Sequence, residues 1–232
     1  MKIVAVVSAA LIAAMSANGE GSRPLVVFAD LRNSESVKGI AFPSNAAVKA
    51  GCDVEVRNGP LGDWDSGKLL EGADVVVFTG GMDNYSGPLG TPKGRLTLTR
   101  FIAGGRGVLL AGFRSGPVRT GYRPLCGDVA STYGGHPLTP WFSPVGDSPI
   151  AKAFGGERLF TAGFDCLGLR LGSDGTPFAK CGDEIVGAFG PFGLGRAVVV
   201  GMFVSANRKE VRFPIFYINN VFRIWLHKIQ EM

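Results

Sequence analysis

The chain has 232 residues, of which 46% are hydrophobic and 19% charged; this suits one large globular domain and excludes a disordered protein. The formal net charge is +5, and the lysines and arginines are scattered along the chain, so we do not expect a nucleic-acid-binding protein. The 35 glycines have no fixed period, which excludes a simple repeat or a fibre.

A positively charged residue and an apolar run at the N-terminus predict a signal peptide over residues 1–17. Lys2 supplies the charge, and residues 3–15 form an apolar core of 13 residues, which is too short to span a bilayer. We therefore expect an exported protein, periplasmic or secreted, with a single domain over residues 18–232 and no membrane segment once the signal is removed. The alternative is that Ile3–Val7 is simply the first strand.

The first half of the chain alternates strand and helix patterns. Short apolar runs without polar alternation are typical of strands buried on both faces of a parallel sheet, and they occur at residues 24–30, 74–79 and 108–111. The alternating residues 53–57 predict an exposed or edge strand. Helices that end at glycines are predicted at residues 42–50, 63–70 and 92–102. Three strand-helix-strand passages in a row predict an α/β fold with a parallel, doubly wound sheet.

The second half has a different pattern. Residues 118–140 are predicted to form a long surface loop. Residues 159–171 and 178–190 predict two antiparallel strands joined through residues 172–176. A tight turn at residues 193–196 then leads into a buried strand over residues 197–204. The apolar stripe of residues 214–230 predicts a closing helix that packs on the sheet.

The strand at residues 108–111 leads into a turn of the form G-x-R-x-G, from Gly112 to Gly116. This is the spacing of a nucleophile elbow, in which flanking glycines let a strained turn lift one side chain above the sheet. The lifted side chain here is that of Arg114. An ordinary strand-to-loop turn with a surface arginine is the alternative.

None of the four cysteines stands in a C-x-x-C pair, so we expect neither a zinc site nor a redox motif. The aspartates are dispersed in the sequence, so we expect no metal ion, and we expect no cofactor. Cys166 and Cys181 flank the predicted hairpin. A disulfide between them and four separate buried thiols are the two alternatives.

Several stretches, taken in order, resemble the class I glutamine amidotransferase-like superfamily. Residues 73–81 and a helix that ends in residues 100–108 carry the first part of this resemblance. Residues 147–154 look like the H-P-I-x-x-G-L segment of the trehalose-utilisation (ThuA-like) branch, and residues 192–202 resemble its Y-G-K-G-R-V strand. The resemblance covers residues 24–229 in pieces. It implies a flavodoxin-like fold: a doubly wound, mostly parallel sheet with helices on both faces and an antiparallel excursion in the second half.

The sequence departs from this family at the catalytic positions. An amidotransferase has a cysteine at the elbow, where this chain has Arg114, and a histidine after a late strand, where it has Ser205–Arg208. The only histidines are His136, in the predicted loop, and His227, on the closing helix. We therefore expect no glutamine hydrolysis by a Cys-His-Glu triad.

In an open α/β sheet the ligand lies beyond the carboxyl ends of the strands. Arg114 would offer a planar guanidinium to a carboxylate or phosphate, so we expect a small polar or anionic ligand such as a sugar or sugar acid. The residues predicted to bind it are Asp30, Arg32, Gly80, Gly81, Asp83, Arg114, Ser115 and Asn207.

Two other functions remain open. The first is an enzyme of carbohydrate metabolism in which Ser115 is the nucleophile, or in which His136 and Asp83 form an acid-base pair. The second is a structural or interaction module of an exported complex, which would expose a large apolar patch. The missing triad argues against an enzyme, and the sequence does not predict an oligomeric state.

Overall fold

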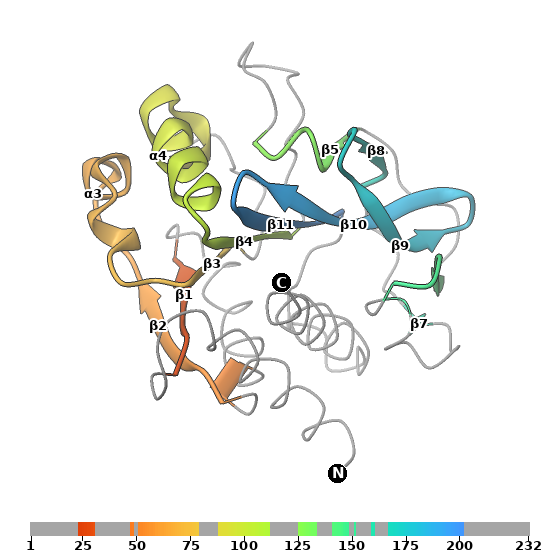
Figure 1. The fold of residues 1–232 in the computed structure, drawn as a ribbon, viewed down its shortest axis with the longest axis horizontal. Helices are drawn as coiled ribbons and strands as arrows, with labels where there is room; N and C mark the ends of the chain where they lie inside the picture. The colour runs from red at the N-terminus through yellow and green to blue at the C-terminus, as the bar shows by residue number, and fades with distance from the viewer. Residues whose placement is uncertain are drawn as a thin grey trace.

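The computed structural model describes residues 23–30, 47–48, 51–78, 88–111, 125–133, 141–148, 151, 159–160 and 167–201. These residues form a mixed α/β fold built on one large sheet (Figure 1). The predicted α/β class is therefore confirmed. None of the helices in the described ranges is long and apolar enough to cross a membrane.

Nine strands of the described residues make up the large sheet, in the order β2-β1-β3-β4-β11-β10-β9-β6-β7. Five of them pair in parallel: β2 (Asp53–Arg57), β1 (Leu25–Ala29), β3 (Val75–Phe78), β4 (Gly107–Ala111) and β11 (Gly195–Val200). Four antiparallel strands continue the sheet: β10 (Glu184–Phe192), β9 (Thr176–Cys181), β6 (Trp141–Pro144) and β7 (Leu159–Phe160). The predicted parallel first half and antiparallel second half are both present.

The central parallel strands are apolar because both faces of the sheet are covered. Successive side chains of a strand point to opposite faces, and all four residues of β3 are buried. In β11, five of the six residues are buried. Strand β2 alternates polar and apolar residues, is mostly exposed and lies at the end of the described strand order, as the sequence predicted.

Two helices lie side by side on one face of the sheet (Figure 1). Helix α4 (Pro92–Ala103) begins at Thr91, whose Oγ1 accepts a hydrogen bond of 3.0 Å from the Gly94 amide, and this is an N-cap. The helix predicted at residues 63–70 is two pieces, α3 (Leu61–Ser66) and the 3-10 turn η2 (Lys68–Leu70), because Gly67 has a left-handed φ of 85°. A further 3-10 turn, η3 (Pro88–Gly90), precedes α4.

Parts of two other predicted helices remain open. Only Ala47 and Val48 of the helix predicted at residues 42–50 are described, and both are helical. The closing helix predicted at residues 214–230 lies outside the described residues.

The hairpin predicted from residues 159–171 and 178–190 is wrong. The second stretch is itself part of a hairpin, in which β9 and β10 are joined by the two residues Gly182 and Asp183, with a φ of 63° at Gly182. Strand β8 (Leu169–Leu171) instead pairs with β5 (Ala130–Thr132) in a small separate sheet. The Gly-Asp dipeptide is a recognised hairpin signal that the long apolar pattern concealed.

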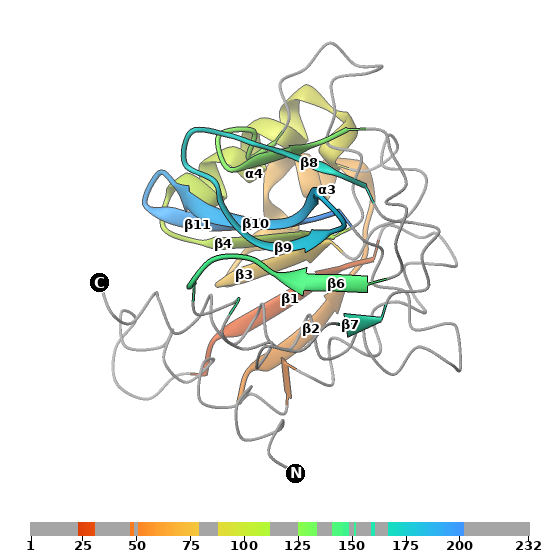
Figure 2. The same cartoon turned by 90° about the vertical axis from the view of Figure 1, so that its right-hand side faces the viewer.

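The surface loop predicted at residues 118–140 is also wrong in part. Leu125, Cys126, Val129 and Ala130 are at most 4% exposed and belong to the core beneath α4. Figure 2 shows α4 and the β5–β8 pair above β4, β10 and β11. The segment of residues 125–132 thus lies next to α4 and helps to cover the same face of the sheet, rather than forming an excursion over the surface.

One carboxylate joins the amino ends of three parallel strands. Asp74, directly before β3, accepts a hydrogen bond of 2.8 Å from the Leu25 amide of β1 and forms an ion pair with Arg106, directly before β4. Its backbone carbonyl accepts a hydrogen bond of 2.9 Å from the Gly107 amide. These contacts fix the register in which Val75 lies beside Val26 and Gly107.

Candidate functional site

The carboxyl edge of the parallel strands begins at Asp30, which directly follows β1. The Asp30 amide donates a hydrogen bond of 3.0 Å to the Arg57 carbonyl, and Asn58 Nδ2 donates one of 3.4 Å to Asp30 Oδ2. Asp30 therefore lies at the edge where the sequence placed it, beside a second polar residue that the sequence reasoning missed. Its contact with a ligand stays a prediction.

The other predicted site residues lie outside the described residues: Arg32, Gly80, Gly81, Asp83, Arg114, Ser115, His136 and Asn207. The strands that lead to two of these groups are described, since β3 ends at Phe78 and β4 ends at Ala111. The roles of these residues as ligand-binding or catalytic groups remain predictions.

A second polar cluster lies at the same edge, beyond the end of β11. The Gly201 amide donates a hydrogen bond of 2.9 Å to the carbonyl of Val186 in β10, and the Leu167 amide donates one of 2.6 Å to the Gly201 carbonyl. Glu184 lies two residues before Val186 and Gly168 directly follows Leu167, so both stand past the carboxyl end of β11.

The cluster consists of Tyr133, Gly168, Arg170 and Glu184. A hydrogen bond to the Glu184 carboxylate raises the pKa of the Tyr133 hydroxyl, and burial adds to the increase, so the phenol is protonated at neutral pH. The Arg170 guanidinium lies 5.3 Å from the centre of the Tyr133 ring, a cation-π contact. Gly168 has no room for a side chain, because a Cβ there would overlap both Glu184 and Tyr133.

Glu184 has one feature typical of a functional group. Its carboxylate meets the Tyr133 hydroxyl, but its Oε2 atom is buried and has no hydrogen-bond partner in the part of the chain that the structure describes. Buried acceptors without a donor are uncommon in folded proteins. Sequence reasoning missed this cluster because it depends on β5, β8 and β10 meeting in space, whereas the predicted strand boundaries placed them elsewhere.

Asp30 and Glu184 do not belong to one compact site. Four interstrand spacings of about 4.8 Å separate β1 from β10, so these two strands lie roughly 19 Å apart along the edge. This edge of the sheet therefore carries two separate groups of polar side chains, one beyond β1 and one beyond β11 and β10. A small ligand would contact one group or the other.

Two buried thiols can be assessed as nucleophiles. Burial raises the pKa of Cys126 from its ordinary 9.0 to about 12, and burial also raises the pKa of Cys52. Both are free cysteines, and both are protonated at neutral pH. Cys181 is buried as well, and Cys166 lies outside the described residues, so the disulfide alternative stays untested.

We expect Cys52 and Cys126 to resist alkylation in the native protein. At pH 8 only about one Cys126 thiol in 10⁴ is ionised, against about one in ten for a thiol with the ordinary pKa of 9.0. Iodoacetamide labelling followed by peptide mass spectrometry should leave both residues unmodified until denaturant is added. Because folding raises the pKa of Cys126, the contribution of its protonated thiol to the free energy of unfolding is fully present below about pH 9. This contribution is lost as the pH rises towards 12. Rapid labelling at pH 8 without denaturant would contradict the assignment.

No protein-family model and no curated protein matches this sequence. Solved structures do match its fold. A cytoplasmic protein of Salmonella typhimurium LT2, STM1381, is 12% identical with a TM-score of 0.62, over 89% of this chain and 99% of that one. A second, STM3548 of Salmonella typhimurium, is 14% identical with a TM-score of 0.55, over 90% and 98%. The beta-galactosidase of Bacillus circulans sp. alkalophilus is 11% identical with a TM-score of 0.56, over 88% of this chain but only 30% of that one.

The predicted localisation is corrected by these comparisons. Both Salmonella proteins, which match nearly over their full length, are described as cytoplasmic, and this contradicts the expectation of an exported protein. The expectation depended on the apolar residues 3–15, and an apolar run of that length also occurs in segments that pack inside a folded domain. At these identities the likeness shows the fold alone.

Proposed function

We propose that this chain is a ligand-binding domain of the class I glutamine amidotransferase-like superfamily, near its ThuA-like branch, that has lost glutamine hydrolysis. Its ligand is a small polar or anionic molecule, such as a sugar or sugar acid, held at the carboxyl edge of the parallel strands. The observation that carries the proposal is the strand order β2-β1-β3-β4-β11, which is flavodoxin-like and reverses between β1 and β3.

Ligands of open α/β sheets bind in the crevice beyond such a reversal. Asp30 stands at one side of it, at the end of β1. Gly80 follows the end of β3 by two residues, and Arg114 follows the end of β4 by three, so the chain holds the Arg114 Cα within about 11 Å of that strand end. A guanidinium in this place suits a carboxylate, which it can bind through two parallel hydrogen bonds.

The protonated thiols support the loss of glutamine hydrolysis. A cysteine nucleophile acts as the thiolate, and burial opposes ionisation of both Cys52 and Cys126. Neither of them falls in the G-x-R-x-G sequence of residues 112–116, in which Arg114 stands at the position that the resemblance gives to the family's nucleophile.

Calorimetric titration with gluconate and glucuronate, against neutral glucose, tests the proposal. We expect a sugar acid to bind, and Arg114→Ala to weaken its affinity by about 10- to 100-fold through loss of a charge-assisted hydrogen bond. Arg100→Ala is the matched control, since Arg100 is exposed on the last turn of α4. Equal affinity in Arg114→Ala, or no binding of either acid to the unaltered protein, would contradict the proposal. Turnover of a bound sugar would favour the enzyme alternative.

A further inference from the structure

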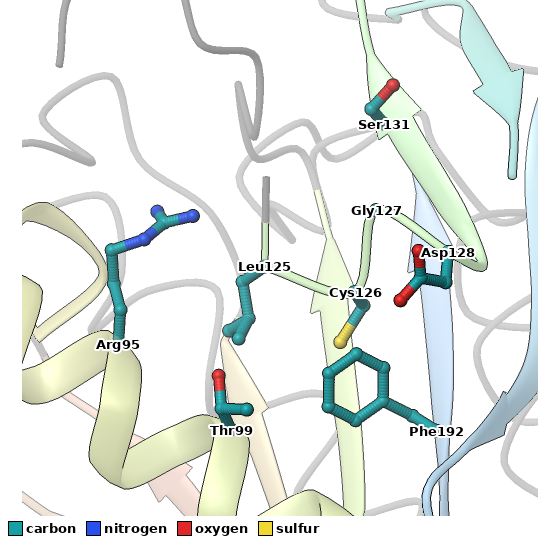
Figure 3. Close-up of a pocket in the computed structure, with 8 residues that line it drawn as sticks. All are labelled: Arg95, Thr99, Leu125, Cys126, Gly127, Asp128, Ser131 and Phe192. Carbon is teal, nitrogen blue, oxygen red and sulfur yellow. The ribbon is translucent and has the colours of Figure 1, made fainter. Parts of the chain in front are cut away.

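A pocket of about 470 Å³ lies on the α4 side of the sheet, away from the strand ends discussed above. It opens between α4 and the segment of residues 125–131, and Figure 3 shows the side chains of the two elements facing each other across it. The side chains that decide its chemistry are those of Arg95, Thr99, Cys126, Asp128, Ser131 and Phe192.

The wall opposite α4 is fixed by its backbone. The Asp128 and Val129 carbonyls accept hydrogen bonds of 2.8 Å and 3.0 Å from the amides of Asp174 and Gly172. Cys126 has a left-handed φ of 60°, which is a strained conformation for a residue with a side chain. Strain of this kind persists where the surrounding structure requires it, and it is common at ligand sites.

Three polar groups in the pocket have no partner among the residues that the structure describes. The hydroxyls of Thr99 and Ser131 and the carboxylate of Asp128 make no hydrogen bond or ion pair with any described residue, although each lines the pocket. Arg95 lies on the same face of α4 as Thr99, four positions earlier, and its Nη1 donates a hydrogen bond of 2.9 Å to the Leu89 carbonyl. Because of this bond the guanidinium is held in place at one end of the pocket.

The charges select the kind of ligand. An anion would meet the Asp128 carboxylate, and a cation would meet the Arg95 guanidinium, so the lining favours a neutral molecule. Hydroxyl groups both donate and accept, which matches a carboxylate, a guanidinium and two hydroxyls together. Phe192 supplies a half-buried aromatic surface for the C–H groups of such a molecule.

From this geometry we propose that the pocket between α4 and residues 125–131 binds a small neutral polyhydroxylated molecule, a monosaccharide. Its hydroxyls bond to Asp128, Thr99 and Arg95, and its apolar face lies on Phe192. This site is separate from the carboxyl edge and does not depend on the proposed function.

Saturation-transfer NMR and calorimetry with glucose, galactose and mannose test the proposal on the whole chain. We expect one of them to bind with a Kd in the millimolar range. Asp128→Ala should weaken it by at least about 10-fold, because a charged hydrogen-bond acceptor is lost. Asp183→Ala is the matched control, since Asp183 is an exposed aspartate in the β9–β10 turn. Asp128 is itself exposed, so its replacement should not unfold the protein.

The outcomes separate the two sites. Sugar binding that Asp128→Ala weakens and Arg114→Ala leaves unchanged supports the pocket. Binding that Asp128→Ala does not change, or no binding of any of the three sugars at about 50 mM, overturns it. Preferential binding of an amino acid such as glycine, which would place its ammonium on Asp128 and its carboxylate on Arg95, overturns it as well.

Discussion

Gly195→Ala is expected to lower the free energy of unfolding by more than about 4 kcal/mol, the size of effect that follows from a severe backbone clash. Gly195 opens β11, and a Cβ at this position would overlap the carbonyl oxygens of Ile102 and Arg106. These are backbone atoms at the end of α4 and the start of β4, so no side chain can rotate to make room. The central pairing of β11 with β4 would have to separate.

Urea denaturation followed by circular dichroism measures this loss. Gly62→Ala is the control, because Gly62 lies exposed in α3 and a Cβ there would meet nothing within 4 Å. Alanine at that helical position should stabilise the protein by roughly 0.5–1 kcal/mol. If the two variants unfolded at the same urea concentration, the close approach of β11 to α4 would be wrong.

Two other glycines of the described residues make backbone approaches of the same kind. Gly175 would overlap the Val129 carbonyl and Gly190 the Asp174 carbonyl if either carried a Cβ. The first contact joins the turn before β9 to the segment of residues 125–132, and the second joins β10 to the same turn. From the sequence, a glycine predicts a turn or a helix end more readily than a backbone contact between distant segments, so these contacts were not predicted.

The parallel half of the sheet was predictable because it is locally encoded. Each of the strands β1, β3 and β4 is an apolar run that the sequence bounded within one residue at either end, and α4 has an N-cap, a first-turn proline and a glycine end. The pairing of β5 with β8 joins residues about 40 positions apart, and no periodic pattern in the sequence predicts that these two strands pair.

The same difference applies to the candidate site. Asp30 was found because it follows a recognisable strand. Glu184 and Tyr133 were missed because their meeting depends on three strands whose order cannot be deduced from spacing. The pocket residues Thr99 and Asp128 were missed because they belong to two segments that are distant in the sequence.

Phe78→Ala is expected to destabilise the protein by about 3–5 kcal/mol and to lower its melting temperature by roughly 6–20 °C. Phe78 is fully buried at the end of β3, and its ring centre lies 6.0 Å from that of Trp64 in α3. This pair packs α3 against the end of β3, and the predicted ligand residues Gly80 and Gly81 follow that strand end in the sequence. Loss of the ring therefore removes packing at the point from which that stretch begins.

Phe78→Leu separates packing from ring stacking. Leucine keeps most of the apolar volume, so we expect the free energy of unfolding to fall by less than about 2.5 kcal/mol. Of this, about 1.5 kcal/mol at most comes from the changed packing and about 1 kcal/mol from the missing aromatic contact. Calorimetric melting of the two variants, with sugar-acid titration of each, connects the core to the site. If Phe78→Ala melted as high as Phe78→Leu, the ring would carry little packing. If Phe78→Leu kept its stability and lost the ligand, the end of β3 would position the ligand residues through the shape of the ring rather than through its burial.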